Sequence, residues 1–141
     1  MNKPRIPAEL IQAYTSTHYH VFSSTEFTLK IGQYSAELHA LYSQTGTDSS
    51  VFITECNPYS EPLSNAQNKL TQQTLIENIE AAGYKFQHGE GKHTDTNWPG
   101  EKSIFILGHS KEASIDLGKE YGQNAVVWTG SNAVPELLIT L

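Results

Sequence analysis

The sequence predicts an α+β domain, a sandwich with a mixed, largely antiparallel sheet and ferredoxin-like split βαβ connectivity in its C-terminal two-thirds. Two segments near the N-terminus alternate apolar and polar residues, which is typical of half-buried strands. Two later runs of continuous apolar residues indicate central strands, and each precedes a segment with helical periodicity. The chain has 141 residues, which suits one domain, so residues 1–141 are expected to form a single domain.

A helix and a hairpin are expected first. Pro7 suits the first position of a helix that extends to residue 16. Tyr19 and Val21 then alternate with histidines, and the apolar residues of segment 27–31 alternate with polar ones. The polar residues 23–25 between these segments indicate a hairpin connection, so the two strands are expected to pair.

A second helix and the first central strand follow. The helix is expected to begin near Ser35, with Leu38 and Tyr42 facing inward, and to give way to the polar loop 44–50. The compact apolar run 51–54 then indicates a strand that lies inside the sheet.

The longest helix has a clear start and a clear end. Ser64 and Gln67 have the spacing of a capping box, in which each side chain binds the backbone amide of the other residue. Gly83 is placed to end the helix in a left-handed conformation. Its expected buried side consists of Leu70, Leu75, Ile76 and Ile79.

A long loop is expected before the second central strand. Residues 84–86 indicate a short strand, whereas 87–102 shows no periodicity and is rich in glycine and polar residues. Loops of this length are uncommon and are often functional. The apolar run 104–107 then forms the second central strand.

The C-terminal part predicts a last helix and one or two strands. Ser110 is placed to cap the helix, and Gly122 is placed to end it. Residues 125–128 indicate a further strand, and 137–141 form either a last strand or a helical turn.

Composition argues against several classes of partner. The formal net charge is −6, and the basic residues do not cluster, so no nucleic-acid partner is expected. No apolar segment approaches the roughly 18 residues that span a bilayer, so no membrane partner is expected. The single cysteine suits a reducing compartment, and residues 1–5 lack an apolar signal core, so a cytoplasmic location is expected. The sequence does not predict an oligomeric state.

The first candidate binding residues follow the first central strand. Pro58 keeps the residue before it out of helical geometry, so Asn57 is expected to be extended at the end of the strand. Asn57 and Ser60 are candidates for binding a polar ligand, and Asn68, near the start of the long helix, is expected to face the same loop. The alternative is a structural Asn-Pro turn and a solvated Asn68.

The second group of candidates precedes the other central strand and consists of Trp98, Glu101 and Ser103. If the two central strands are antiparallel neighbours, the end of one lies beside the start of the other. Asn57 and Ser60 should then approach Glu101 and Ser103, with Trp98 and the loop 87–102 as one wall of a pocket. The alternative assigns Trp98 to a hydrophobic plug and Glu101 to a loop anchor.

Gln123 and Asn124 stand before the strand 125–128 and complete the candidate binding residues. The alternative for this pair is that the amides satisfy backbone groups left free by the preceding helix.

Metal and cofactor motifs are absent from the sequence. His18 with His20, and His88 with His93, lack the spacing of a specific metal site, so no metal is expected. No Walker loop, dinucleotide-binding glycine pattern or nucleophile elbow occurs, so no cofactor is expected. The glycines in segment 89–91 indicate flexibility alone.

The chain resembles a known family through a series of landmarks in order. They are Phe52-Ile53-Thr54, then Asn57-Pro58-Tyr59-Ser60, Asn68, Trp98 with Glu101 and Ser103, and Gly122-Gln123-Asn124-Ala125. With these motifs the chain resembles the domain of unknown function 3293 family of short bacterial proteins. The resemblance implies no activity, substrate or cofactor, and its landmarks are the polar groups that the strand argument places together.

Two functional hypotheses follow. The first is a binding or regulatory module that holds a small polar molecule, or a segment of a protein partner, at Asn57, Trp98 and Glu101. The second is a small hydrolase or transferase in which Glu101 is the general base and the candidate catalytic residue. The sequence offers Glu101 no histidine or second acid at a diagnostic spacing, which favours the binding module.

Overall fold

The computed structural model describes residues 8–23, 26–54, 64–93 and 100–140. The elements in chain order are α1 (Ala8–Ser16), β1 (Thr17–Phe22), β2 (Phe27–Leu29), α2 (Ala36–Thr45), β3 (Ser50–Thr54), α3 (Asn65–Ala81), β4 (Phe86–His93), β5 (Glu101–Leu107), α4 (Lys111–Glu120), β6 (Ala125–Thr129) and β7 (Pro135–Ile139). The mixture of helices and one sheet confirms the predicted α+β class.

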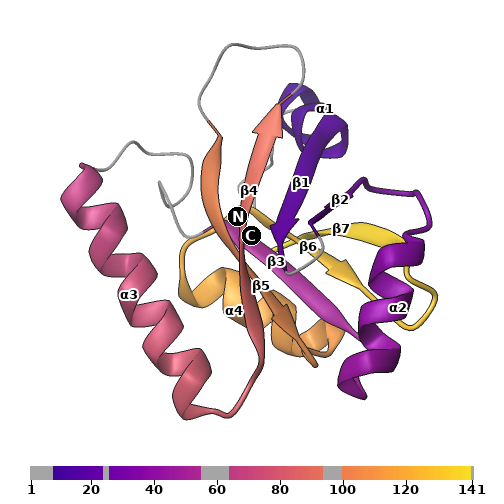
Figure 1. The fold of residues 1–141 in the computed structure, drawn as a ribbon. Helices are drawn as coiled ribbons and strands as arrows, with labels where there is room; N and C mark the ends of the chain where they lie inside the picture. The colour runs from indigo at the N-terminus through magenta and orange to yellow at the C-terminus, as the bar shows by residue number, and fades with distance from the viewer. Residues whose placement is uncertain (1–7, 24–25, 55–63, 94–99, 141) are drawn as a thin grey trace.

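One curled sheet holds all these strands (Figure 1), in the order β2-β1-β4-β5-β3-β6-β7. Every pairing among them is antiparallel, so the expectation of a mixed sheet is wrong for the part of the chain that the structure describes. The reason lies in the position of β5. It pairs with both β3 and β4, so these two strands, which α3 connects, run in the same direction without becoming neighbours.

The two faces of the sheet carry separate apolar clusters because successive side chains of a strand point to opposite faces. We call the face with Phe52 and Phe105 the inner face; its cluster packs against α2. The outer face carries Val51 and Ile53, and its cluster packs against α3 and α4. Figure 1 shows α2 and α3 on opposite sides of the curled sheet.

The helix boundaries confirm the predicted caps. Ser35, Ser64 and Ser110 each accept a hydrogen bond from a backbone amide of the first turn, and Ser64 forms the complete capping box. Gly83 and Gly122 follow α3 and α4 with φ of 83° and 66°. These positive angles favour glycine, because a Cβ atom is strained there.

The predicted long loop is wrong in large part. Residues 87–93 belong to β4, and β5 already begins at Glu101. Gly89 and Gly91 stand opposite Val21 and Tyr19 in the register of β1, and so occupy positions on the inner face. A glycine at an inward position carries no apolar side chain, so the alternation that marks a strand is invisible in the sequence here.

The buried side of α3 is shorter than predicted. Leu75 and Ile79 are buried, but Leu70 is 64% exposed. Leu75 lies five positions after Leu70, which turns the helix by about 140° beyond one full turn, so the two side chains do not share a face. Near the C-terminus, where a last strand and a helical turn were both open, residues 135–139 form the strand β7.

The capping box of α3 carries a stability prediction. Replacing Ser64 by alanine is expected to lower the free energy of unfolding by about 1 kcal/mol, because the amide of Gln67 loses its acceptor. Urea unfolding at neutral pH measures the change. Ser43→Ala is the control, because Ser43 is exposed within α2 and caps no amide of that helix. Equal losses for both variants would contradict the capping role.

Candidate functional site

The start of β5 and the end of β3 meet on the inner face. Thr54 stands opposite Ser103, and their hydroxyl oxygens lie 2.8 Å apart. The Ser103 hydroxyl donates to the backbone carbonyl of Glu101 at 3.0 Å. Ser103 is fully buried, so these bonds satisfy its hydroxyl and bind the two strand ends together.

A row of three residues crosses the neighbouring strands beside this contact. Tyr19 of β1 stands opposite Gly91 of β4, and Gly91 stands opposite Glu101 of β5. Residues opposite one another point to the same face, so Tyr19 and Glu101 flank a position without a side chain. A Cβ atom built on Gly91 would lie 3.8 Å from the Tyr19 ring.

The electrostatics of Tyr19 reflect this arrangement. Burial raises the pKa of Tyr19 well above its ordinary value, and the charges of Tyr14 and Glu101 add to the rise, while a side-chain hydrogen bond with Thr17 opposes it. The Tyr19 hydroxyl donates to the backbone carbonyl of Tyr14 at 2.6 Å. Tyr19 is therefore a neutral hydrogen-bonding group at neutral pH.

Helix α1 adds a tyrosine and contacts the start of β6 through it. The side-chain nitrogen Nδ2 of Asn124 lies 3.5 Å from the Tyr14 hydroxyl, at the limit of a hydrogen bond. Asn124 is buried, and its backbone carbonyl accepts from the amide of Thr140 at 2.9 Å. We call the set Tyr14, Tyr19, Thr54, Glu101, Ser103 and Asn124 the strand-end cluster.

Glu101 carries the charge of the strand-end cluster. Partial desolvation raises the pKa of its carboxyl above the ordinary 4.5, although the residue as a whole keeps an exposed surface. Among the described residues, no side chain or amide donates a hydrogen bond to this carboxylate. Within the described residues this carboxylate has lost water without gaining a donor, and such a group favours a ligand that brings one.

The structure places the predicted site residues in different parts of the chain's fold. Glu101, Ser103 and Asn124 belong to the strand-end cluster, where Tyr14 and Tyr19 link them. Gln123 is buried beside Asn124, and its Nε2 lies 3.5 Å from the Tyr121 carbonyl, in agreement with the alternative for these amides.

The other predicted residues lie on α3 or outside the described part of the chain. Asn68 is half-buried on α3. Asn57, Ser60 and Trp98 lie outside the described residues. The antiparallel pairing of β3 with β5, on which the argument for them depended, is confirmed.

Sequence reasoning missed Tyr14, Tyr19 and Gly91. Both tyrosines occupy positions of apolar periodicity, so they read as core residues, and only the packing of α1 beside β1 shows where their hydroxyls lie. The spacing of Gly89 and Gly91 by two residues was the available signal, because it continues the inward positions of a strand.

Two other kinds of site are absent from the described residues. Within the described ranges, no three histidine, cysteine, aspartate or glutamate side chains gather as a possible metal site. None of the described helices combines the length and the apolar character that crossing a bilayer requires.

Comparison with known proteins identifies one family. The family described as "Protein of unknown function (DUF3293)" has a model that matches residues 53–126. No curated protein and no solved structure matches the chain. The matched segment includes Thr54, Glu101, Ser103 and Asn124, whereas Tyr14 and Tyr19 precede it. Because the match covers more than half of the 141 residues, the chain belongs to this family of unknown function.

Proposed function

We propose that the chain is a binding module that takes a small polar ligand, or a polar segment of a partner protein, at the strand-end cluster. The observation that carries the proposal is the Glu101 carboxylate, which is partly desolvated and receives no hydrogen bond from the described residues. Asn57, Ser60 and Trp98 are proposed as further contacts, since the chain leaves β3 and enters β5 beside Glu101.

The state of Glu101 supports a functional role over a structural one. A loop anchor accepts hydrogen bonds that hold its carboxylate in place, and such bonds lower a carboxyl pKa. Glu101 shows the opposite direction. Groups with a perturbed pKa gather at functional sites. There a protein keeps a group that lowers its folding stability because binding or catalysis requires that group.

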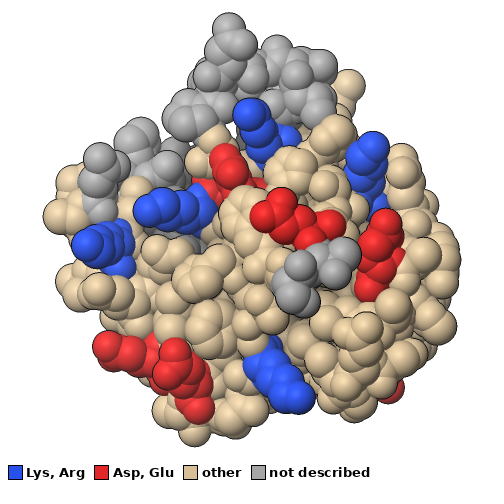
Figure 2. Space-filling view, viewed as in Figure 1, with Lys and Arg blue, Asp and Glu red and all other residues tan. Residues whose placement is uncertain are grey.

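The neighbouring groups define the ligand chemistry. Glu101 offers a negative charge, and the Tyr14 hydroxyl and the Asn124 amide combine donors with acceptors. A ligand that presents N–H or O–H donors to Glu101 satisfies the carboxylate and restores part of its lost solvation. Figure 2 shows acidic and basic side chains scattered over one face with uncharged surface between them, which favours a small ligand over a polyanion.

Substitution of Glu101 by glutamine tests the proposal. The folded protein binds the Glu101 proton more tightly than the unfolded chain, so ionisation of this group above pH 4.5 lowers stability. We expect Glu101→Gln to melt at a higher temperature than the wild type at pH 7, with the difference shrinking as the pH falls to 4.5 and below. In a thermal-shift screen of polar metabolites, a compound that stabilises the wild type should shift the variant less.

Glu77→Gln is the matched control, because Glu77 is an exposed carboxylate on α3. It should change neither the melting temperature nor the response to ligands. A lower melting temperature of Glu101→Gln at pH 7 would identify Glu101 as a structural anchor, and an unchanged ligand response would remove it from the binding site.

The raised pKa of Glu101 also favours the second candidate, a small hydrolase or transferase with Glu101 as general base. An enzyme of this kind would turn over ester or phosphoester substrates with a rate that rises as Glu101 ionises. In an enzyme, Glu101→Gln should abolish the turnover. A binding module without activity should show no turnover of these substrates, in the wild type or in the variant.

We also propose ferredoxin-like split βαβ connectivity, a single domain and a cytoplasmic location for this chain. The order β4-β5-β3-β6 and the helices α3 and α4 on one face support ferredoxin-like split βαβ connectivity. A single sheet that carries both apolar clusters supports one domain over residues 1–141. The single cysteine supports a cytoplasmic location.

A further inference from the structure

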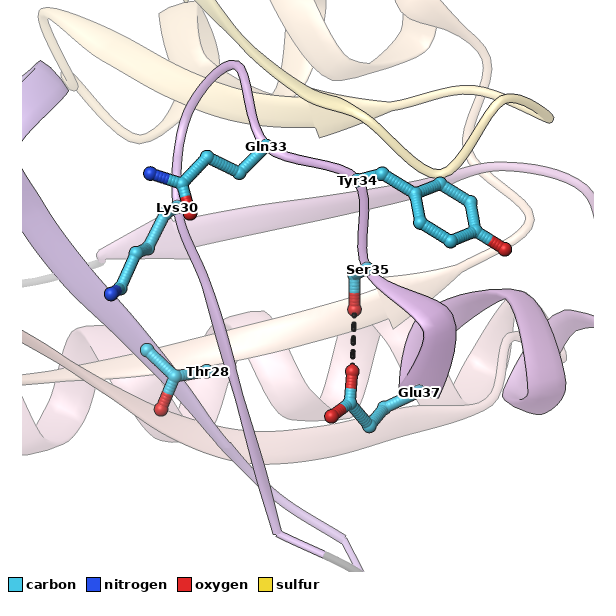
Figure 3. A pocket seen from close by; sticks show the side chains of 6 residues that line it. All are labelled: Thr28, Lys30, Gln33, Tyr34, Ser35 and Glu37. Carbon is cyan, nitrogen blue, oxygen red and sulfur yellow. Dashed lines mark hydrogen bonds between the residues drawn. The ribbon is translucent and has the colours of Figure 1, made fainter.

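A hollow of about 290 Å³ lies between β2 and the start of α2. It shares no residue with the strand-end cluster, and β1 and β4 separate β2 from Glu101 in the sheet. Figure 3 shows the side chains that surround it, which are those of Thr28, Lys30, Gln33, Tyr34, Ser35 and Glu37. Its volume is near the lower end of the range for small-molecule sites.

The backbone of this hollow is held in place on both sides of Gln33 and Tyr34. The amide of Gly32 donates to the carbonyl of Pro135 at 2.8 Å, and the amide of Ser35 donates to the carbonyl of Ala133 at 2.8 Å. These bonds fasten the turn after β2 to the turn before β7. The wall is therefore formed before any ligand arrives, which reduces the entropy that binding must overcome.

Tyr34 is exposed although its backbone is anchored. Its side chain is 60% exposed, so it contributes little to the apolar core. The ring has one described aromatic neighbour, His39, at a centroid distance of 6.4 Å. Tyr34 lines the hollow, and Figure 3 shows its ring pointing away from Lys30 and Thr28, so the ring does not fill the space between these residues and Glu37.

Charges of both signs border the hollow. Figure 3 places the ammonium group of Lys30 on one side and the carboxylate of Glu37 on the other. Among the described residues these two groups do not form an ion pair with each other. The Ser35 hydroxyl donates to the Glu37 carboxylate, with Oγ 3.5 Å from Oε2. The hollow thus separates a cation from an anion.

We propose that this hollow is a second binding site that takes a small zwitterion of the α-amino acid class. The ligand carboxylate faces Lys30, with the Gln33 amide as a further donor. The ligand ammonium faces Glu37.

Single-charge ligands fit the site less well. An anion beside Lys30 leaves Glu37 without a partner in the hollow, and a cation beside Glu37 leaves Lys30 without one. A zwitterion satisfies both charges at once. The structure therefore favours a molecule with both groups over either half of it.

Titration of the full-length protein with L-serine, followed by ¹H–¹⁵N NMR, tests this inference. The amide signals of Gln33, Tyr34 and Ser35 should move with saturation, while those of Thr54 and Ser103 should stay in place. Acetate and methylammonium are the half-ligands, and each should bind at least about tenfold more weakly, or about 1.4 kcal/mol. Equal shifts with either half-ligand, or none with L-serine, would overturn the proposal.

Two substitutions and a matched control locate the charges. Lys30→Gln and Glu37→Gln should each weaken L-serine binding about tenfold, because each leaves one ligand charge without its partner. Glu112→Gln is the control, since Glu112 occupies the same position in the first turn of α4 that Glu37 occupies in α2. It should leave the affinity unchanged.

The outcomes also separate this site from the first one. Shifts confined to Thr54 and Ser103 would assign L-serine to the strand-end cluster and contradict the second site. If Glu112→Gln lost affinity as Glu37→Gln does, the binding of L-serine would depend on the net charge of the protein and not on the hollow. The effect of Glu101→Gln in the metabolite screen depends neither on the NMR shifts with L-serine nor on the affinity of Glu112→Gln, so the two proposed sites can fail independently.

Discussion

Gly89→Ala is expected to lower the free energy of unfolding by about 3 kcal/mol, which is the upper part of the usual range for overpacking a core. A Cβ atom at Gly89 would lie 2.6 Å from the carbonyl oxygen of His20 and 2.8 Å from Cε2 of Phe52. The first of these atoms belongs to the backbone of β1, and Phe52 is 2% exposed, so neither can move away cheaply.

Gly91→Ala provides the matched control two residues along the same strand. Its Cβ atom would meet nothing closer than 3.8 Å, which is ordinary van der Waals contact. Alanine also restricts the unfolded chain more than glycine, so the variant should be as stable as the wild type or up to about 1 kcal/mol more stable. Urea unfolding of both variants measures the difference. Equal stabilities of the two variants would show that the close approach at Gly89 is relieved at little cost.

Alkaline destabilisation through Tyr42 is the second large effect. The Tyr42 hydroxyl donates to the carbonyl of Thr129 at 2.9 Å and lies 2.9 Å from the Ser50 hydroxyl. Burial raises the pKa of Tyr42 from 10.0 to about 12, against the effect of the Ser50 bond, and Asp48 adds to the rise. The folded protein thus holds this proton more tightly than the unfolded chain.

The sign of the pH dependence follows from that shift. The stabilisation is complete below pH 10, where both states are protonated, and is lost as the pH rises through about 12. A shift of this size corresponds to about 2 to 3 kcal/mol. The raised pKa of Tyr19 adds a loss in the same direction. Urea unfolding between pH 8 and pH 12 measures the sum.

Tyr42→Phe isolates the contribution of this residue. The variant should lose about 1 to 2 kcal/mol at pH 8, because Ser50 and Thr129 lose a buried partner, and should show a smaller further loss at high pH. Tyr34→Phe is the control, since Tyr34 is 60% exposed and should leave the alkaline loss unchanged. A steep alkaline loss that persists in Tyr42→Phe would assign it to other groups.

Features that depend on neighbouring residues along the chain were predictable. The caps at Ser35, Ser64 and Ser110 form within one turn of helix, so their spacing alone predicts them. The central strands β3 and β5 were predictable because both their faces are covered, which requires continuous apolar residues. The strand β4 was not predictable, because its inward position 89 is a glycine, whose missing side chain leaves room for the Phe52 ring, and the apolar alternation of a strand is therefore absent.

The candidate site divides in the same way. The sequence by itself determined that Glu101 and Ser103 precede a buried strand and that another buried strand ends in a polar stretch, because both facts follow from local hydrophobic pattern. Only the tertiary structure decided that β5 pairs with β3 and β4 at once, and that Tyr14 and Tyr19 join Glu101 and Asn124. Strand order and the packing of α1 depend on contacts between residues distant along the chain, whose free energy no local window of sequence contains.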